Sequence, residues 1–512
     1  MSQHRLRTRI AAAATAAVAL ISPLSACGAT GSDTAASAGT SLVASSVAGL
    51  DDTHADADDG EYDAAAATGI TLADGATTVD GTGADAVSVD GDVVTISAAG
   101  TYVLSGTLTD GQVVVDSTGD GKVRLVLDGV DITSATSSPV VITEADEAVV
   151  ILADGSANTL ADAAASAADD EEDDAPNATL FSMADLTIAG SGSLTVAGNS
   201  NDGITSKDGL VILSGTIDVT AVDDGIRGKD YLVIEDGEIT VTAGGDGLKA
   251  DNESTETSSG KAKALGWFQL DGGTVTIAAG SDGVDVVGAL NIADGSLTVT
   301  RSEEGLEAAQ ITLAGGETTL TASDDGINAT AGNGGEGVQE GVLLTISGGT
   351  THVTAGADGI DSNGIAVMTG GTVVIESAAR GGGDGSIDVN GDFAISGGSL
   401  VATGGLSDVP STDSTQGWIA TTLTTAASAG QQITVVDGDG EVVATYVVEQ
   451  AASGIVVSDE DITAGEDYEV RVDGTTAATV TAGEYAGGGG PGGGGPGGGG
   501  PRDGGFDGAP SR

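Results

Sequence analysis

The chain has 512 residues, of which 85 are glycine and only 2% are aromatic, so large rings cannot fill its core. Small aliphatic side chains must instead pack in layers, as they do in repeat proteins. The formal net charge of −61 argues against nucleic acid as a partner, because its phosphates would be repelled, and suits a secreted, cation-binding protein.

The first 27 residues have the features of a bacterial lipoprotein signal peptide. Three arginines between residues 5 and 9 precede a short apolar stretch at residues 10–21, and residues 24–27 (LSAC) match a lipobox. A stretch this short is typical of a signal peptide and not of a membrane span. We predict that residues 1–27 form the signal, that Cys27 carries the lipid, and that the protein is exported and anchored, surface-exposed, on the outer face of the cell membrane. The alternative is a plain signal peptide with an incidental cysteine.

Two polar segments flank the central part of the chain. Residues 28–60 are rich in small and polar residues without a hydrophobic period, which predicts a disordered tether. Residues 487–512 start as GGGGP repeats and predict a disordered tail, because they cannot bury enough apolar surface to fold.

A repeat of about 22 residues dominates the region between these segments. Its first marker is an acidic residue followed by glycine and an aliphatic residue, and successive marker glycines are 22, 22, 36, 22, 21 and 33 residues apart. The two long spacings are one repeat plus a polar insertion, at residues 252–264 and 332–341. A second glycine marker keeps step with the first: Gly215, Gly237, Gly273, Gly295, Gly316, Gly349 and Gly371.

Within each repeat, short alternating segments predict strands. Ile217 and Val219 alternate with Asp218, for example, which places the aliphatic side chains inside and the polar ones outside. A period of 22 without helical patterns predicts one turn of a right-handed, single-stranded parallel β-helix. We place the β-helix at residues 61–414, with its first coils and cap between residues 70 and 152. A small β cap at residues 415–486 would cover the last coil.

The chain resembles a known family in several motifs. These are residues 177–182 (NATLFS), 190–196 (GSGSLTV), 201–204 (NDGI) and 358–364 (DGIDSNG). They resemble the bacterial carbohydrate-binding domain-containing β-helix proteins, calcium-binding proteins of cellulose or pectin that are related in fold to pectate-lyase-like polysaccharide lyases. The resemblance covers roughly residues 60–480. It implies binding of plant or cell-surface polysaccharide, with calcium.

The acidic marker residues would stack one above another in a β-helix. Repulsion between them at a spacing of ~4.8 Å has to be offset. One account is that each carboxylate caps a turn while the following glycine supplies a positive φ. The other is that the carboxylates bind Ca²⁺, which takes six to eight oxygen ligands. The stacked residues are Asp202, Asp224, Asp246, Asp282, Glu304, Asp325 and Asp358.

Calcium is expected where further oxygen ligands crowd the column. The first candidate set is Glu304, Glu307, Asp324, Asp325, Asp358, Asp361 and Asn363. The second is Asp223, Asp224, Asp246 and Asp251. The number of ions is left open.

Basic residues are scarce and clustered. Between residues 28 and 500 there are eleven lysines and arginines, and six lie between Lys207 and Lys263. They either neutralise neighbouring carboxylates or dock a uronate carboxylate, and Trp267 follows them either as a sugar platform or as core. The candidate carbohydrate-binding residues are Lys207, Arg227, Lys229, Lys249 and Trp267.

We therefore predict a non-catalytic, monomeric lipoprotein that binds an acidic or plant cell-wall polysaccharide with the help of calcium. One alternative is a calcium-dependent polysaccharide lyase that uses Lys229 or Lys249 as the base for β-elimination, although acidic surroundings would raise the pKa of either lysine. The other alternative is a structural adhesin. No catalytic residue is assigned.

Overall fold

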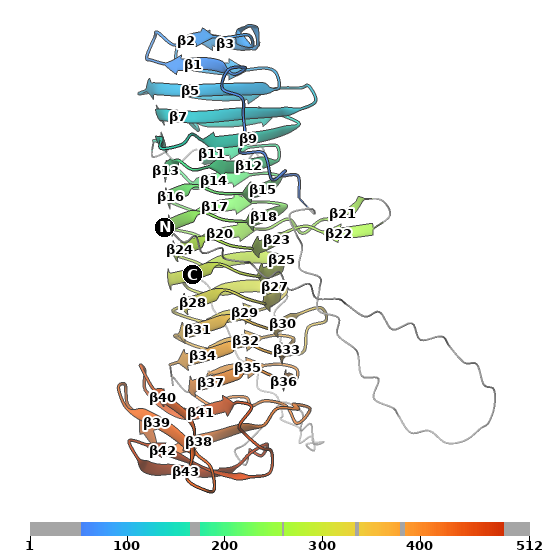
Figure 1. Ribbon diagram of the computed structural model, residues 1–512, viewed down its shortest axis with the longest axis vertical. Coiled ribbons are helices and arrows are strands. Elements are labelled where there is room, and N and C mark those ends of the chain that lie inside the picture. Colours follow the sequence, from blue (N-terminus) through green and yellow to red (C-terminus); the bar gives the residue numbers. More distant parts are fainter. Residues whose placement is uncertain (1–52, 164–174, 259–260, 333–336, 379–384, 486–512) are drawn as a thin grey trace, which may run out of the picture. The chain divides into compact units, whose positions relative to one another are not determined.

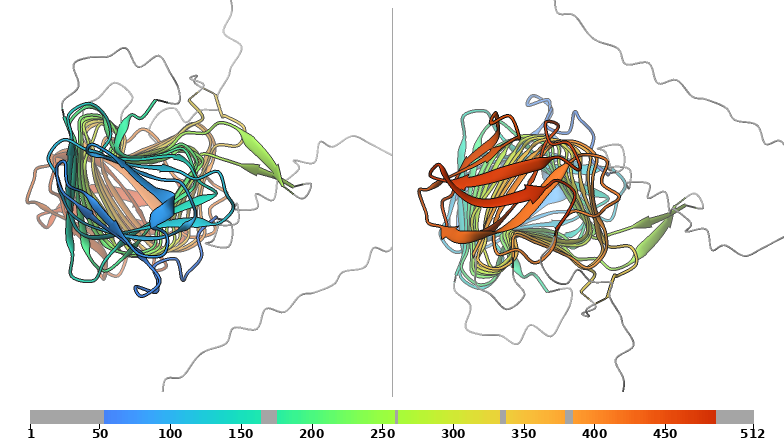
Figure 2. Two further views of the ribbon diagram at one scale, coloured as in Figure 1. Left: turned by 90° about the horizontal axis from the view of Figure 1, so that it is seen from above. Right: turned by 90° about the horizontal axis from the view of Figure 1, so that it is seen from below.

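A computed structural model describes residues 53–163, 175–258, 261–332, 337–378 and 385–485. Residues 1–45 and 46–512 form separate units, and all described residues belong to the second. This unit is all-β, with one 37-stranded, mostly parallel sheet wound into a β-helix-like stack of coils (Figures 1 and 2). The described residues contain one short 3₁₀ helix, Ala84–Ala86, and no α-helix. The prediction of an all-β, largely parallel architecture is confirmed.

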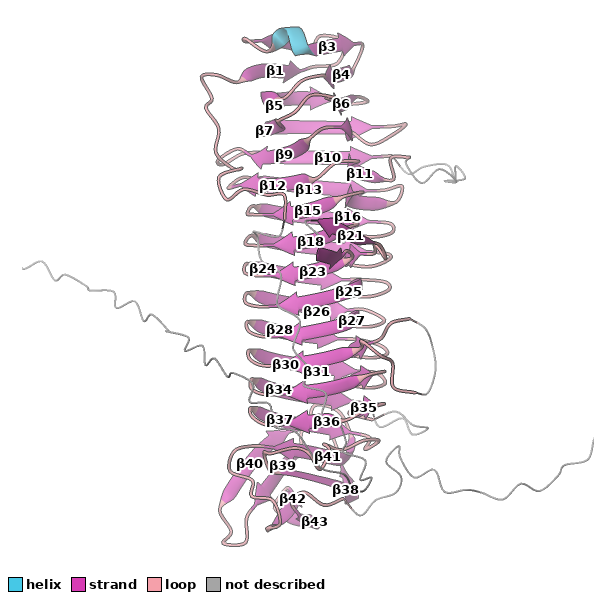
Figure 3. Ribbon diagram, turned by 90° about the vertical axis from the view of Figure 1, so that its right-hand side faces the viewer, coloured by secondary structure: helices cyan, strands magenta, loops and turns pink. Residues whose placement is uncertain are grey.

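Strand pairing arranges the coils into three walls (Figure 3). Wall 1 contains β9 (Glu147–Leu152), β12 (Leu186–Gly190), β15 (Gly209–Ile212), β18 (Tyr231–Ile234), β23 (Trp267–Leu270), β30 (Leu343–Ile346), β33 (Ile365–Met368) and β36 (Phe393–Ile395). Wall 2 contains β10 (Ala157–Asp162), β13 (Ser193–Gly198), β16 (Thr216–Ala221), β19 (Glu238–Ala243), β24 (Thr274–Ala278), β26 (Ser296–Arg301), β28 (Glu317–Thr321), β31 (Thr350–Ala355), β34 (Thr372–Ser377) and β37 (Ser399–Gly404).

Wall 3 lies between wall 2 of one coil and wall 1 of the next. It contains β4 (Val93–Ile96), β6 (Gln112–Asp116), β8 (Val140–Glu144), β11 (Ala178–Ser182), β14 (Asp202–Ser206), β17 (Ile226–Gly228), β20 (Leu248–Ala250), β29 (Ile327–Ala329), β32 (Ile360–Ser362) and β35 (Ile387–Val389). Four longer strands contribute to two walls each: β5 (Gly100–Leu108), β7 (Lys122–Ser134), β25 (Val284–Ile292) and β27 (Leu306–Leu313).

The alternation of residues explains the core. In β16, Ile217 and Val219 are buried, whereas Thr216, Asp218 and Thr220 are exposed. The same inward positions pair from coil to coil, so that aliphatic side chains stack along the axis of the coils. Because each layer is filled by Leu, Ile and Val, the stack needs few aromatic rings.

The two glycine markers have different structural roles, and one prediction about them is wrong. The second marker supplies the positive φ, as at Gly215 and Gly237, both at +127°. The glycine after the acidic residue does not have a positive φ. At Gly203 a Cβ would lie 2.2 Å from Val219 Cγ1 and 2.7 Å from the Gly225 carbonyl oxygen. Close approach of neighbouring coils is therefore what requires this glycine.

Residues 53–60 are packed against wall 1, so the predicted tether is wrong for this stretch. His54 hydrogen-bonds with Tyr231 Oη of β18 at 2.7 Å and with Thr187 Oγ1 of β12 at 3.0 Å. Asp59 is fully buried and accepts hydrogen bonds from Lys122 Nζ at 2.7 and 2.6 Å. We call residues 53–62 the strap. It is polar, and polarity alone suggested disorder, but its Asp56 and Asp59 form ion pairs with Lys122 of the wall.

Antiparallel strands lie at both ends of the stack. Near the start, β2 (Thr78–Asp80) pairs with β1 (Thr68–Leu72), and β3 (Val87–Asp90) pairs with β4. Near the end, β41 (Ala452–Ser458) pairs with both β37 and β38 (Trp418–Ala427), and Trp418 is buried in the main core. A separate four-stranded sheet contains β39 (Gln432–Val436), β40 (Val442–Val447), β42 (Asp467–Val472) and β43 (Thr475–Thr481).

The C-terminal strands are tied to the stack by a buried carboxylate. Glu376 of β34 is fully buried and accepts hydrogen bonds from the backbone N–H groups of Glu449 at 2.7 Å and Gln450 at 2.9 Å, and from the hydroxyl of Tyr446. Elsewhere the hairpin of β21 (Thr255–Ser258) and β22 (Lys261–Ala264) projects sideways from the coils (Figure 1).

Several predicted segments lie outside the described residues. These are the signal peptide with Cys27, most of the tether and the glycine-rich tail. No helix in the described part of the chain is both long enough and apolar enough to cross a membrane.

Candidate functional site

Two columns of polar side chains run beside each other along wall 3, and we call them together the acidic strip. Column one contains the acidic marker residues Asp202, Asp224, Asp246, Asp282, Glu304, Asp325 and Asp358. Column two lies three residues further along each coil, and the strand register stacks its members directly: Thr205, Arg227, Lys249, Asp285, Glu307, Asn328, Asp361 and Asp388.

Column one is held by hydrogen bonds between successive coils. Asp246 N donates to Asp224 Oδ1 at 3.0 Å, and Asp282 N donates to Asp246 Oδ1 at 3.0 Å. The pattern recurs at Asp358 N, which donates to Asp325 Oδ1 at 2.8 Å. The aspartates of column one each accept a backbone N–H of the next coil in this way, whereas Glu304 Oε2 accepts from the side chain of Asn328. These bonds to the next coil replace the capped-turn account.

In the upper part of the strip, from Asp202 to Lys249, basic side chains compensate the carboxylates. Lys249 Nζ bonds Asp246 and lies 3.6 Å from Asp224 Oδ2 and 3.1 Å from Asp285 Oδ2. Burial acts to lower the pKa of Lys249, but the hydrogen bond to Asp246 and the charges of Asp224 and Asp285 raise it above its ordinary value. A lysine held in this way is charged and is a poor proton acceptor.

Arg227 is also engaged within the strip. It donates to both oxygens of Asp251, from Nε at 3.1 Å and from a terminal nitrogen at 2.6 Å. Of the second predicted calcium set, Asp224, Asp246 and Asp251 therefore have basic partners from the chain itself, and Asp223 is exposed at the edge of the strip.

The lower part of the strip, from Glu304 to Asp388, has a different electrostatic environment. In the described ranges, no lysine, arginine or histidine forms an ion pair with Glu304, Glu307, Asp358 or Asp361. Burial raises the pKa of Asp358 to about 8 and that of Asp361 to about 7, and neighbouring carboxylates add to both shifts. The pKa values of Glu304 and Glu307 are raised as well, mainly by burial.

Asn328 lies in the middle of the lower part. Its side chain is nearly buried, with 8% of the residue exposed, and Nδ2 donates to Glu304 Oε2 at 2.7 Å. The buried carbonyl oxygen Oδ1 has no hydrogen-bond partner among the residues that the structure describes. Asn328 lies between Glu307 and Asp361 in column two. Its unsatisfied buried oxygen lowers the stability of the folded state unless a ligand supplies a partner for it.

The other predicted ligands of the first calcium set have different positions. Asp324 is exposed beside Asp325. The Oδ1 atom of Asn363 accepts a hydrogen bond from Gln339 Nε2 at 3.0 Å, so it is engaged away from the strip. No three histidine, cysteine, aspartate or glutamate side chains of the described residues already form a compact metal cluster. The oxygen-rich donor set and the unsatisfied Asn328 carbonyl nevertheless suit a hard cation.

Lys207 and Lys229 are the predicted basic residues that have no acidic partner. Neither forms an ion pair within the described residues, and Lys207 Nζ lies 5.9 Å from the centroid of the Phe181 ring. Burial lowers the pKa of Lys207, and the charges of Arg227 and Lys229 lower it further. The ammonium group of Lys207 can bind a ligand carboxylate without first breaking an ion pair.

Trp267 cannot act as the predicted sugar platform in this conformation. It is 4% exposed and stacks on Tyr231, with ring centroids 4.9 Å apart and an interplanar angle of 19°. Both rings belong to a cluster on the outer side of wall 1 that also contains Ala55 of the strap. The strap therefore covers the face that a sugar would need.

Sequence reasoning missed three members of column two that carry a carboxylate or amide side chain. Asp285, Asn328 and Asp388 were not selected, although each lies three residues after a position in column one or its continuation at Gly385. Reading the position at that fixed offset in every repeat would have found them.

The repeat region matches a known protein family. A family model described as carbohydrate-binding domain-containing protein matches residues 90–343. A protein of Acetivibrio thermocellus with the same description is 41% identical over 216 residues, which are 42% of this chain and 73% of the relative. This chain belongs to the carbohydrate-binding domain-containing family.

A solved structure is also similar to the chain. It is the gadolinium derivative of a polysaccharide lyase-like protein from C. thermocellum, 33% identical, with a TM-score of 0.40, covering 49% of this chain and 92% of that one. The residues matched by the family model include most of the acidic strip but end before Asp358.

Proposed function

We propose that this chain is a non-catalytic, cell-surface protein that binds an acidic polysaccharide with the help of calcium. The observation that carries the proposal is the lower part of the acidic strip, where the buried Asp358 and the half-buried Glu304, Glu307 and Asp361 have raised pKa values and no basic ion-pair partner among the described residues. Membership of a carbohydrate-binding family and the polysaccharide lyase-like relative support the ligand class.

Calcium would be held by the lower part of the strip. Glu304, Glu307, Asp358 and Asp361 would supply carboxylate oxygens, and Asn328 Oδ1 would supply a neutral one. A bound Ca²⁺ provides a positive charge that can bridge these carboxylates to the carboxylates of a uronate polymer. The protein's own part is to hold the oxygens on a rigid parallel wall, where the strand register fixes their spacing.

Lys207 and Lys229 would form a second contact for the same polymer. They lie on the upper coils beside Arg227, whose charge is already matched by Asp251. Uronate carboxylates could therefore bind calcium on the lower coils and ammonium groups on the upper coils. A long ligand running along the axis of the coils fits both contacts.

A polysaccharide lyase is the second candidate, and one observation favours it. Lys207 has a lowered pKa, as a general base requires, whereas the raised pKa of Lys249 removes that lysine from consideration. In β-elimination the amine would take the proton next to the uronate carboxylate, the C4–O4 bond would break, and a C4–C5 double bond would form. Unsaturated products would reveal this reaction.

The finer features of the fold and location belong to the same proposal. We infer right-handed winding with about 22 residues per coil, supported by pairings such as Ile204–Ile226–Leu248 and by the strong preference of parallel crossovers for that hand. We also propose a monomeric state. Export and lipid attachment at Cys27 are supported by the basic, apolar and lipobox segments before residue 28.

Calorimetric titration with polygalacturonate, in CaCl₂ and again in a chelator, tests the proposal. The chain should bind in calcium and lose at least tenfold in affinity in the chelator, and Asp361→Ala should weaken binding while Asp218→Ala, on wall 2, should not. Equal binding with and without chelator would contradict the calcium role.

Ultraviolet absorbance from unsaturated uronate would show that the chain is a lyase, and Lys207→Gln should then abolish it.

A further inference from the structure

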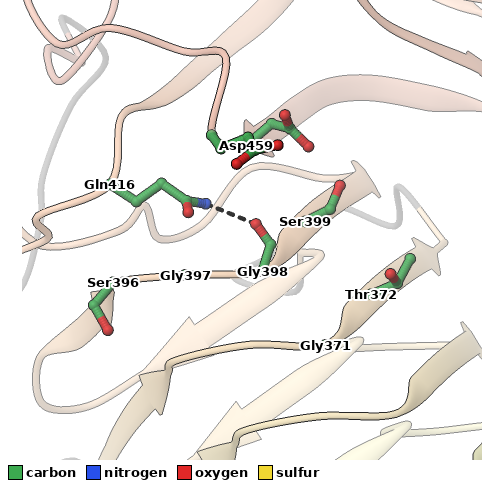
Figure 4. Close-up of a pocket in the computed structure, with 9 residues that line it drawn as sticks. Gly371, Thr372, Ser396, Gly397, Gly398, Ser399, Gln416 and Asp459 are labelled. Atoms are coloured by element: carbon green, nitrogen blue, oxygen red, sulfur yellow. Dashed lines mark hydrogen bonds between the residues drawn. The ribbon is translucent and has the colours of Figure 1, made fainter.

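A polar cavity lies where the last coils meet the C-terminal strands (Figure 4). Its volume is about 560 Å³, within the range of small-ligand sites. Its floor is formed by the glycine turns that lead into β34 and β37, and its upper side by Gln416 and by the residues that follow β41. It lies outside residues 90–343, the part of the chain that matches the family model.

The floor presents bare backbone. Gly371 and Gly398 have φ values of +83° and +92°, and a Cβ at Gly398 would lie 2.7 Å from backbone atoms of Gly370. The same turn recurs on earlier coils at the second glycine marker. What distinguishes this level is that Gln416 and Asp459 lie over the turn (Figure 4) and that Glu460 also lines the cavity.

Gln416 is fixed in one orientation. Its Nε2 donates to the Gly398 carbonyl oxygen at 2.8 Å and to Ser458 Oγ at 3.0 Å, and Ser458 Oγ donates to the Gly417 carbonyl oxygen at 2.9 Å. Both amide hydrogens are therefore used within the protein. The amide oxygen is left as an acceptor at the cavity, held in place by the coil below and by the strand above.

The remaining lining groups define the ligand chemistry. Thr372, Ser396 and Ser399 contribute hydroxyls that can donate or accept, and Asp459 and Glu460 contribute carboxylates that only accept. None of the nine lining residues is basic, aromatic or a large aliphatic residue. Two carboxylates repel an anion, and the lack of apolar surface disfavours a hydrophobic ligand. A polyhydroxylated neutral molecule matches the acceptors and hydroxyls together.

We propose that this cavity is a subsite for a neutral sugar residue, separate from the acidic strip. The proposal rests on the polysaccharide-binding function and adds the class of sugar that the last coils take. The cavity and the strip lie at opposite ends of the wall 2 strands, since Thr350 and Thr372 begin β31 and β34 while Asp358 follows the end of β31. A strand of six residues separates them by ~18 Å, so the two sites can be occupied independently.

Saturation-transfer NMR and calorimetry on the full chain test the subsite. The probes are neutral tetrasaccharides of glucose, xylose and mannose, measured in EDTA, and tetragalacturonate, measured in CaCl₂. At least one neutral tetrasaccharide should bind in EDTA. The double variant Asp459→Asn/Glu460→Gln and the isosteric Thr372→Val should each weaken it at least fivefold. Asp461→Asn, an exposed carboxylate that does not line the cavity, should have no effect.

The strip variant separates this proposal from the one on which it rests. Asp361→Ala should leave binding of the neutral tetrasaccharide unchanged and weaken tetragalacturonate. The subsite is overturned if no neutral tetrasaccharide binds, if the double variant and Thr372→Val bind as the unaltered chain does, or if Asp361→Ala weakens the neutral probe equally. Failure of tetragalacturonate alone would count against the acidic-polymer function and leave the neutral subsite standing.

Discussion

The upper and lower parts of the acidic strip share one backbone design but differ in how their charge is balanced. In both, a carboxylate accepts the backbone N–H of the next coil, as at Asp246 N–Asp224 Oδ1 and Asp358 N–Asp325 Oδ1. In the upper part Lys249 sits among three carboxylates. At the equivalent positions below, column two has Asn328 and Asp361 in place of a cation. The repeat therefore fixes where charges lie but not how they are neutralised, and we propose that the lower part binds a cation from solution.

The largest effect is expected from removing the internal cation. Lys249→Met leaves Asp224, Asp246 and Asp285 without their shared partner. Because 21% of the lysine side chain is exposed, we expect a loss of about 3 kcal/mol, at the lower end of the range for breaking a buried ion pair. Thermal unfolding followed by circular dichroism should show a Tm several degrees lower, partly recovered by CaCl₂. Lys229→Met, which breaks no ion pair, is the control, and an equal loss there would contradict the account.

A smaller effect is expected from placing a cation in the lower part. Asp361→Lys removes one carboxylate and positions an ammonium group beside Asp358, in the same column as Lys249. In metal-free buffer this variant should melt a few degrees above the unaltered chain, and its response to CaCl₂ should be mostly lost. Asp218→Lys on wall 2 tests whether any added positive charge has the same result. If Asp361→Lys lowers the Tm in metal-free buffer, repulsion is not the main cost at this site.

A third effect is expected from pH. The carboxyl pKa values are raised in the folded chain, to about 8 at Asp358 and about 7 at Asp361, from the ordinary value of 3.8. At pH values between the unfolded and the folded pKa, the folded state binds more protons than the unfolded state. The free energy of unfolding therefore falls as pH rises from about 4 to 8. In metal-free buffer the Tm should therefore be higher at pH 5.5 than at pH 8, and Asp361→Ala should reduce the difference. A Tm that rises over this interval would contradict the sign.

Much of the fold could be predicted because two independent glycine markers recur in register. The markers predict the repeat length, and the period of two in segments such as residues 216–221 predicts the strands. The role of the glycine after each acidic residue could not be predicted in the same way. A glycine is required both where neighbouring coils approach closely and where the backbone has a positive φ. The two causes can be told apart only from the surrounding structure, as at Gly203, where a Cβ would clash with Val219.

Long-range contacts were the part of the site that the sequence could not supply. The strap is polar, and nothing local indicates that Asp59 meets Lys122, 63 residues away, or that His54 meets Tyr231, 177 residues away. Without the strap, Trp267 on an outer wall is a reasonable sugar platform. Column one was predictable from its marker, and Asn328 and Asp285 in column two could have been found three residues after that marker, where the register of wall 3 stacks them.

The most direct test of the external-cation account is the melting temperature of the chain in metal-free buffer with and without added CaCl₂. Binding to the folded state at 100 times Kd adds ~2.7 kcal/mol, enough to raise the Tm measurably. We expect a clear rise with calcium and little with magnesium, which demands a tight octahedron. Asp361→Ala should lose most of the gain, and Asp218→Ala should keep it. An unchanged Tm in calcium, or equal behaviour of the two variants, would mean that the lower part of the strip is stable without an external cation.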